Sequence, residues 1–471
     1  MQNPGTKNKL RFRDLIGTKD FYKKVLLIAV PIMLQNGITN FVGMLDNIMV
    51  GRIGTEQMSG VSIVNQLLFI VMLCLFGATS GAGVIGAQYY GKGDYDGVRN
   101  TFRIKLVISA VILIATVIIL SVFGDNLISM FLHEGSESGD LAATLRYGRD
   151  YLKVMLIGQI PLAIEFSYSS TLRESGETSL PMKASIVAVF VNLVLNYILI
   201  FGKFGAPALG VVGAAVATVV SRFIQLTIVA LYSHKHIEKF PYFEGTYRSF
   251  KVPGKLLGKV ILLALPLMMN ETLWSLGVTT QNACLSTRGL AVVAGMNICV
   301  TICNVFNIIF IALGDSVAII VGQLFGAGKV EEGKLTAYRI IAFSTTITIV
   351  ISSVLFLVGP FFPNIYKTYD EVKELAGNMI RISAIMMPLG AYLHSTYFAI
   401  RSGGKTFITF LFDSGFMWVF AVPLSFFLAN YTTLPAITVY AIVVSSDILK
   451  VVIGTLLLRS GIWARSLVDS E

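Results

Sequence analysis

The 471-residue sequence predicts an all-α membrane protein with twelve transmembrane helices in two pseudo-symmetric lobes of six. Hydrophobic residues make up 55% of the chain and charged residues only 14%, whereas soluble domains carry about 25% charged residues. The apolar stretches are continuous and close to the roughly 20 residues that a spanning helix needs. A transmembrane barrel would instead show short segments of alternating hydrophobicity.

An internal repeat accounts for the two lobes. A shift of 235 positions, with no gap, superimposes Ala29-Val30-Pro31-Ile32-Met33 on Ala264-Leu265-Pro266-Leu267-Met268. The same shift pairs polar residues and glycines over the following 60 residues: Asn47 with Asn282, Gly60 with Gly295, Gln88 with Gln323, Gly91 with Gly326, and Gly93 with Gly328. Self-similarity at a fixed shift is the mark of a repeated architecture.

The apolar runs give six helices in each half. In the first lobe (25–232) they are expected near 25–47, 60–85, 101–122, 147–171, 181–201 and 210–232. In the second lobe (257–458) they are expected near 257–282, 295–321, 338–358, 376–399, 406–428 and 436–458. The remaining segments are an N-terminal segment (1–24), a linker (233–256) and a C-terminal tail (459–471). Small residues of the second helix, among them Gly77 and Gly81, are expected to allow close helix packing.

The positive charges predict the orientation. Lysines and arginines gather before the first helix (Lys7, Lys9, Arg11, Arg13, Lys19, Lys23, Lys24) and between the lobes (Lys235, Lys239, Arg248, Lys251, Lys255, Lys259). Because positive residues stay on the cytoplasmic side, both termini are expected to be cytoplasmic in a cell (inner or plasma) membrane. The net charge of +10 is then explained by this bias and by attraction to anionic membrane lipid, not by nucleic acid.

Polar residues within the first lobe are candidates for a site. Gln35, Asn36 and Asp46 lie within the first helix or at its outer end. Pro31, near the cytoplasmic end of this helix, lacks a backbone donor and allows a bend. A carboxylate inside a membrane costs about 2.5–3.5 kcal/mol and usually faces a cavity or a partner. Asp46 is therefore either a proton or sodium site or an interfacial residue that caps the helix or pairs with Arg52.

The fifth and sixth helices add neutral polar groups. Asn192 and Asn196 are one helical turn apart and share a face, and Thr218 lies in the sixth helix. The two asparagines either bond neighbouring helices or contribute ligands beside Asp46.

The second lobe has its own intramembrane acids. Asn270 and Glu271 lie in the seventh helix, the counterpart of the first, and Asp413 lies in the eleventh. In the last helix, Asp447 and Lys450 are three residues apart and are expected to pair with each other.

Several motifs together carry a family resemblance. They are Gly43-Met44-Leu45-Asp46-Asn47-Ile48-Met49-Val50-Gly51, Gln88-Tyr89-Tyr90-Gly91-Lys92-Gly93 with its copy Gly322-Gln323-Leu324-Phe325-Gly326-Ala327-Gly328, Leu172-Arg173-Glu174-Ser175-Gly176-Glu177-Thr178, and Asn196-Tyr197-Ile198-Leu199-Ile200-Phe201-Gly202. With the two six-helix halves, they resemble the multidrug and toxic compound extrusion (MATE) family over roughly 20–460. Asn270-Glu271-Thr272-Leu273-Trp274 and Asp413-Ser414-Gly415-Phe416-Met417-Trp418 look most like prokaryotic members of the DinF-like kind.

The resemblance implies a V-shaped fold of the MATE type and a secondary antiporter. It would export cationic or amphipathic small organic compounds by alternating access, in exchange for protons or sodium, with no cofactor and no enzymatic activity. It implies ion coupling at Asp46 with Asn192, Asn196 and Thr218. A sodium ion is possible at Asp46, and no structural metal is expected.

For the substrate, Gln35, Asn36, Asn270, Glu271 and Asp413 are expected to contribute to binding, and Pro31 and Pro266 to the conformational change. A monomer is the expected state.

Two other classes remain open. A lipid-linked oligosaccharide flippase of the same wider superfamily should line its cleft with several arginines or lysines, and only Arg222 and Lys450 lie well inside helices. A membrane-embedded enzyme is third, because the helices hold no metal-ligand cluster or Ser/His/Asp arrangement. The absence of a GxxxxGK[ST] motif argues against an ATP-driven pump.

Overall fold

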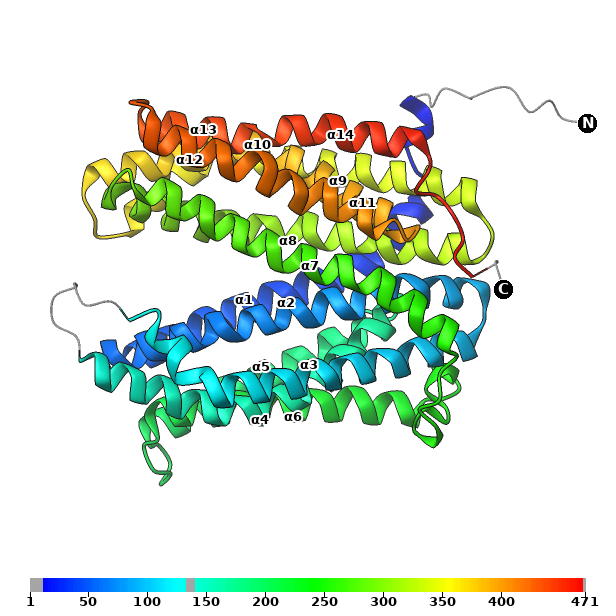
Figure 1. Ribbon diagram of the computed structural model, residues 1–471, viewed down its shortest axis with the longest axis horizontal. Helices are drawn as coiled ribbons and strands as arrows, with labels where there is room; N and C mark the ends of the chain where they lie inside the picture. The colour runs from blue at the N-terminus through cyan, green and yellow to red at the C-terminus, as the bar shows by residue number, and fades with distance from the viewer. Residues whose placement is uncertain (1–11, 133–139, 469–471) are drawn as a thin grey trace, which may run out of the picture. The chain divides into compact units, whose positions relative to one another are not determined.

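The chain folds into long helices joined by short connections, as a computed structural model that describes residues 12–132 and 140–468 (Figure 1). Within these ranges no β-strand is present. The helices of the first half are α1 (Lys19–Gly51), α2 (Thr55–Lys92), α3 (Tyr95–Ser129), α4 (Leu141–Glu174), α5 (Ser179–Phe201) and α6 (Gly210–Lys235). A short 3₁₀ turn, η1 (Phe12–Leu15), precedes them, and η2 (Pro241–Phe243) and η3 (Thr246–Arg248) follow.

The second half repeats this order with more irregular helices near its end. It begins with α7 (Gly254–Ser286), α8 (Leu290–Gly326), α9 (Val330–Val358), the 3₁₀ segment η4 (Gly359–Ile365) and α10 (Asp370–Ser402). The next helical stretch consists of α11 (Thr406–Phe410), two π-helical segments, η5 (Leu411–Gly415) and η6 (Met417–Ala421), and α12 (Val422–Tyr431). The last stretch is α13 (Ala436–Ser445) and α14 (Asp447–Ser460), which are separated at Ser446.

The structure has helices at the positions that the hydropathy pattern predicts. Each of the twelve predicted ranges falls inside one of these helical stretches, which continue beyond it because hydropathy marks only the apolar part of a helix. Among the described residues, ten helical stretches are long and apolar enough to cross a membrane. α4 and α10 are not among them, since serine, tyrosine and charged residues dilute their apolar runs. That all twelve cross a membrane stays a prediction.

By their contacts, the described residues form two compact units. One unit runs from Pro31 to Leu276, and the other combines the residues up to Val30 with those from Gly277 onward. α1 and α7 therefore contribute to both units, dividing after Val30 and after Leu276. The hydropathy pattern predicts lobes at 25–232 and 257–458, and it does not predict that α1 and α7 are each divided between the two units.

Glycines of α2 explain why the first part of α7 belongs with the first half. A Cβ atom on Gly77 would lie 2.5 Å from the Cα of Met268, and one on Gly81 would lie 2.4 Å from the Cα of Ala264. Only glycine allows the two backbones to approach this closely. The close packing expected for the small residues of this helix is present, and its partner is α7.

The repeat extends to backbone conformation. Gly93 ends α2 with a φ of +81°, and Gly328, its partner under the shift of 235, has a φ of +73° after α8. Such angles are readily available only to glycine. The repeated glycine therefore serves the same tight turn in both halves.

The linker between the halves packs against the first half. Tyr242 and Phe243 are almost fully buried, and the Arg103 guanidinium of α3 donates to the backbone carbonyls of Gly245 and Thr246, both at 2.9 Å. Lys239 pairs with Glu177, and this hydrogen bond raises the pKa of the Lys239 amine. This part of the linker is anchored by specific contacts.

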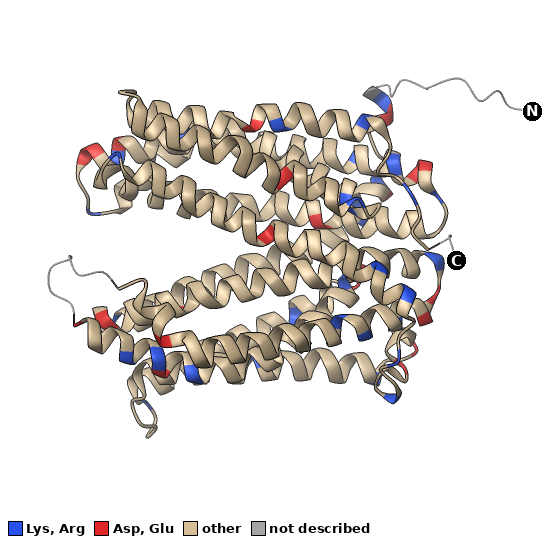
Figure 2. Cartoon of the chain, in the orientation of Figure 1, with Lys and Arg blue, Asp and Glu red and all other residues tan. Residues whose placement is uncertain are grey.

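Charged residues gather at the helix ends and in the connections, and few lie in the middles of the helices (Figure 2). This is the distribution that a membrane imposes, because a charge in the hydrocarbon layer is expensive. The few interior charges are therefore the residues that need a functional or structural explanation.

Candidate functional site

The unit from Pro31 to Leu276 joins Asp46 of α1 to polar residues of α5 and α6. The Nδ2 group of Asn196 donates to Oδ1 of Asp46 at 2.6 Å and to Oδ1 of Asn192 at 3.1 Å. Nδ2 of Asn192 in turn donates to Oγ1 of Thr218 at 3.3 Å. The four residues predicted for ion coupling thus form one hydrogen-bonded chain across three helices.

The helical register produces this arrangement. Asn192 and Asn196 are buried, at 5% and 1% exposure, on the face of α5 that packs against α6. Oδ1 of Asn196 is buried and has no hydrogen-bond partner among the described residues. The amide therefore stabilises the carboxylate with its donor and keeps an oxygen available for a cation.

Asp46 has no ion pair among the residues that the structure describes, and no basic side chain acts on it as basic side chains act on Glu174 and Glu165. Glu174 pairs with Lys105 at 2.5 Å. Glu165 accepts from Ser169 and from Nε2 of Gln225 at 3.0 Å, and lies in the field of two arginines, Arg173 and Arg222. A carboxylate that has neutral donors but no fixed cation is suited to bind an exchangeable one.

Two residues near this chain were missed by the sequence analysis. Tyr151 of α4 donates from its hydroxyl to Oδ1 of Asn65 in α2 at 3.2 Å, and it lies close enough to feel the charge of Asp46. Asn65 had a signal, since it is a polar residue inside the apolar run of the second helix. Tyr151 had none, because tyrosines are common near the ends of membrane helices.

Gln35 belongs to a different polar network of the same unit. Its Nε2 donates to Oγ of Ser185 at 2.8 Å, and its Oε1 accepts from Arg173 at 2.6 Å. Ser185 also accepts from Gln225 at 3.1 Å, which connects this network to Glu165. The structure therefore brings Gln35 together with Glu165 and Arg173, and not directly with the Asp46 chain.

The other predicted substrate residues fall in both units. Asn36 of α1 and Asn270 and Glu271 of α7 belong to the unit that contains Asp46, where Asn270 is 1% exposed. Asp413 belongs to the other unit and forms an ion pair with Lys450. The prediction that Asp447 forms an ion pair with Lys450 is wrong. The Lys450 amine instead binds Asp413, which lies in η5.

The predicted hinge prolines are both inside helices. Pro31 lies in α1 and begins the unit that runs to Leu276, whereas Pro266 lies in α7 well before that unit ends. The two prolines correspond in the repeat but differ in their distance from the division between units.

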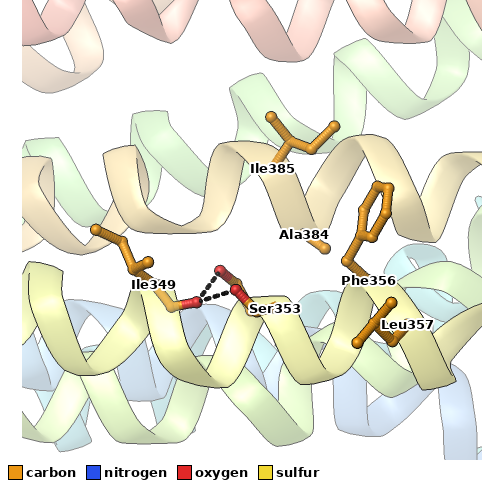
Figure 3. Close-up of a pocket in the computed structure, with 7 residues that line it drawn as sticks. Ile349, Ser353, Phe356, Leu357, Ala384 and Ile385 are labelled. Atoms are coloured by element: carbon orange, nitrogen blue, oxygen red, sulfur yellow. Dashed lines mark hydrogen bonds between the residues drawn. The ribbon is translucent and has the colours of Figure 1, made fainter.

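A cavity of about 380 Å³ between α9 and α10 is a separate feature. Its walls are apolar, with the hydroxyls of Ser352 and Ser353 both bonded to the carbonyl of Ile349 (Figure 3). Its described lining is apolar apart from these two hydroxyls and contains no charged residue.

Comparisons with known proteins agree with this architecture. A family model described as MatE matches residues 31–198 and 266–427, and the two matched segments begin at positions that the shift of 235 superimposes. The chain is 28% identical over 456 residues to a probable multidrug resistance protein NorM of Thermotoga maritima, covering 95% of this chain and 94% of that protein. It is 23% identical over 425 residues to a probable multidrug resistance protein YoeA of Bacillus subtilis, covering 89% of each.

A solved structure described as "Crystal structure of MATE in the bent conformation" superimposes with a TM-score of 0.84 at 19% identity, over 95% of this chain and 96% of that one. The fold is thus that of the MATE transporters. Because the family model covers more than half of the sequence in two repeated segments, the chain is a multi-pass membrane protein that belongs to the MatE family, the multidrug and toxic compound extrusion (MATE) transporters.

Proposed function

We propose that this protein is a secondary multidrug antiporter that exports cationic or amphipathic organic compounds in exchange for protons or sodium. The observation that carries the proposal is the chain from Asp46 through Asn196 and Asn192 to Thr218, in which the carboxylate has a donor at 2.6 Å but no ion pair among the described residues. The names of the relatives, which are multidrug resistance proteins, support the choice of substrate class.

In this mechanism Asp46 alternates between binding the coupling cation and releasing it. An uncompensated carboxylate is costly inside a membrane. The ionised Asp46 is therefore higher in energy without a bound cation than with one. Differential affinity of this kind is what moves a two-state equilibrium. We assign the bend that accompanies the change to Pro31, where α1 passes from one unit to the other.

For the substrate, we propose that Gln35, Asn36, Asn270, Glu271 and Asp413 contribute to binding. Gln35 and Asp413 are also bonded to Arg173 and Lys450, and these two basic residues would then influence binding as well. We further propose a monomer in the plasma or inner membrane with both termini in the cytoplasm, as the distribution of lysine and arginine favours.

The interior basic groups argue against a lipid-linked sugar flippase. Lys105 is bonded to Glu174 and Lys450 to Asp413, and the Arg222 guanidinium donates to the carbonyl of Gly158 at 3.2 Å. A pyrophosphate would need these cations to be available, so this alternative receives no support.

The test is ethidium transport by the full chain in proteoliposomes, with a proton gradient and a sodium gradient imposed separately. The electrical part of such a gradient is worth about 2.3 kcal/mol per charge per 100 mV, or about fifty-fold in accumulation. We expect one of the two gradients to drive transport, and Asp46→Asn to reduce it to the level of empty liposomes.

The matched control is Asp96→Asn, the same change at an acid of the same half whose side chain is 81% exposed; it should transport normally. Full transport by Asp46→Asn at equal protein levels, or no response of the wild type to either gradient, would contradict the proposal.

A further inference from the structure

The unit that contains the second half has its own buried group of charges. Lys450 of α14 forms an ion pair with Asp413 of η5, and both side chains are largely buried, at 11% and 18% exposure. Asp447 lies three residues before Lys450 on α14, and the charges of Lys450 and Asp413 both act on it. The group therefore joins two helices through one ammonium and two carboxylates.

The surroundings of the amine fix its position. The Lys450 ammonium lies 5.6 Å from the centre of the Phe412 ring. Gly454, one turn further along α14, allows this ring to approach, since a Cβ atom there would lie 3.0 Å from its Cζ atom. The Lys450 ammonium thus lies between the Phe412 ring and the Asp413 carboxylate. The ring face and the carboxylate both attract a positive charge.

The neighbouring helices add other charges at the edge of the group. From α10, His394 lies in the field of Asp413, Lys450 and Arg401, and α13 contributes no acid or amine. Lys450 is bound to Asp413, and Asp447 has no ion pair among the described residues. Because an uncompensated charge is costly in a membrane interior, this group has a physical reason to take up one cation.

The backbone is irregular on both sides of the ion pair. Asp413 lies in the first of two successive π-helical segments, which run from Leu411 to Ala421. On the other side, the regular helix is interrupted at Ser446, directly before Asp447. π-helical turns are rare and often mark functional sites, and irregular turns allow a helix to change its packing locally.

We propose that Asp413, Asp447 and Lys450 form a second proton site, at which Asp447 takes up one proton per transport cycle in addition to the cation at Asp46. With Asp447 protonated, the ammonium is held by Asp413 alone and ties α14 to η5. When Asp447 loses its proton, the two carboxylates share the ammonium and this tie weakens. This inference rests on the proposed antiport function and adds to it a second coupling site.

A proton fits this group better than a sodium ion. An ammonium already occupies the Asp413 carboxylate, and a second small cation beside it would meet a like charge. A hard metal ion also prefers a shell of several oxygen ligands, and no group of three or more acid, histidine or cysteine side chains suited to a metal occurs in the part of the chain that the structure describes.

The first experiment detects the proton without transport. Infrared spectra of the purified full chain in lipid nanodiscs, recorded as a function of pH, report the C=O band of protonated carboxyl groups. In an Asp46→Asn background we expect a pH-dependent band that disappears on adding Asp447→Asn. Adding Asp447→Glu should keep the band, and so should Asp370→Asn, the same change at an acid whose side chain is 99% exposed.

An unchanged band after Asp447→Asn would overturn the proposal, and so would loss of the band on adding sodium at constant pH. If Asp447→Asn does not yield folded protein, Lys450→Gln provides the second variant. Without the ammonium, the two carboxylates repel each other and the band should grow; an unchanged band would again refute a shared site.

The second experiment measures the ratio of protons to ethidium from the reversal potential in proteoliposomes. We expect Asp447→Asn to lower the number of cations coupled to each substrate by one, while Asp46→Asn abolishes coupling. A ratio equal to that of the wild type would reject the second site and leave the proposed function standing. If the wild type shows no antiport at all, the proposed function fails, and the infrared result still decides whether Asp447 binds a proton.

Discussion

The contact between α2 and α7 gives the most exact prediction, because its geometry is set by backbone atoms. Gly81→Ala would place a Cβ atom 2.4 Å from the Cα and 2.6 Å from the Cβ of Ala264. Ordinary contacts lie at about 3.4 Å or more, so α7 would have to move by about 1 Å. Alanine is otherwise the better helix former, by about 0.8–1.0 kcal/mol.

Overpacking of this kind costs about 1–3 kcal/mol, which should outweigh the gain in helix propensity. Gly37→Ala in α1 is the matched control, since no atom lies within 4 Å of the added Cβ. We therefore expect the two identical substitutions to have opposite signs: Gly81→Ala should lower the thermal stability of the purified protein, and Gly37→Ala should leave it unchanged or raise it.

The assay is thermal unfolding in detergent, followed by the fluorescence of a thiol-reactive dye or of tryptophan. A Gly81→Ala protein as stable as Gly37→Ala would refute the reasoning, because it would mean that α7 can move aside without cost. Gly77→Ala offers an independent repetition, with its Cβ atom 2.5 Å from the Cα of Met268.

The remaining predictions concern charges and thiols. Lys105→Met should destabilise the protein by about 3–5 kcal/mol, because it removes the buried ammonium that pairs with the largely buried carboxylate of Glu174. Arg149→Met breaks an ion pair whose side chains are 43% and 49% exposed and should cost about 1 kcal/mol or less; equal losses of unfolding free energy in the two variants would contradict this comparison. Cys299 is 1% exposed and should resist maleimide labelling until the protein unfolds, as mass spectrometry of the intact chain can check.

Much of the candidate ion site was predictable because its members are polar residues in apolar helices. Asp46, Asn192, Asn196 and Thr218 were each identified from the sequence, and the spacing of four put the two asparagines on one face. Their bonds were not predictable, since the register between α1, α5 and α6 depends on packing across helices that are far apart in the chain.

The second half illustrates where this reasoning stops. The spacing of Asp447 and Lys450 favoured a pair within one helix, yet the amine binds Asp413 on a neighbouring segment. A spacing rule compares only residues of the same helix, and it cannot include a carboxylate supplied by another one. The π-helical turns that contain Asp413 had no signal in the sequence either.

The membrane environment, the positions of the helices and the internal repeat could all be predicted from the sequence. These follow from hydropathy and from residue identity at a fixed shift, which are properties of the chain read in order. Three features could not be predicted in this way and depend on the packing of the helices. They are the division of α1 and α7 between two units, the contact of Gly77 and Gly81 with α7, and the choice of which carboxylates pair with a basic side chain. These depend on distances between segments far apart in sequence, where a gap of one ångström separates a contact from a clash.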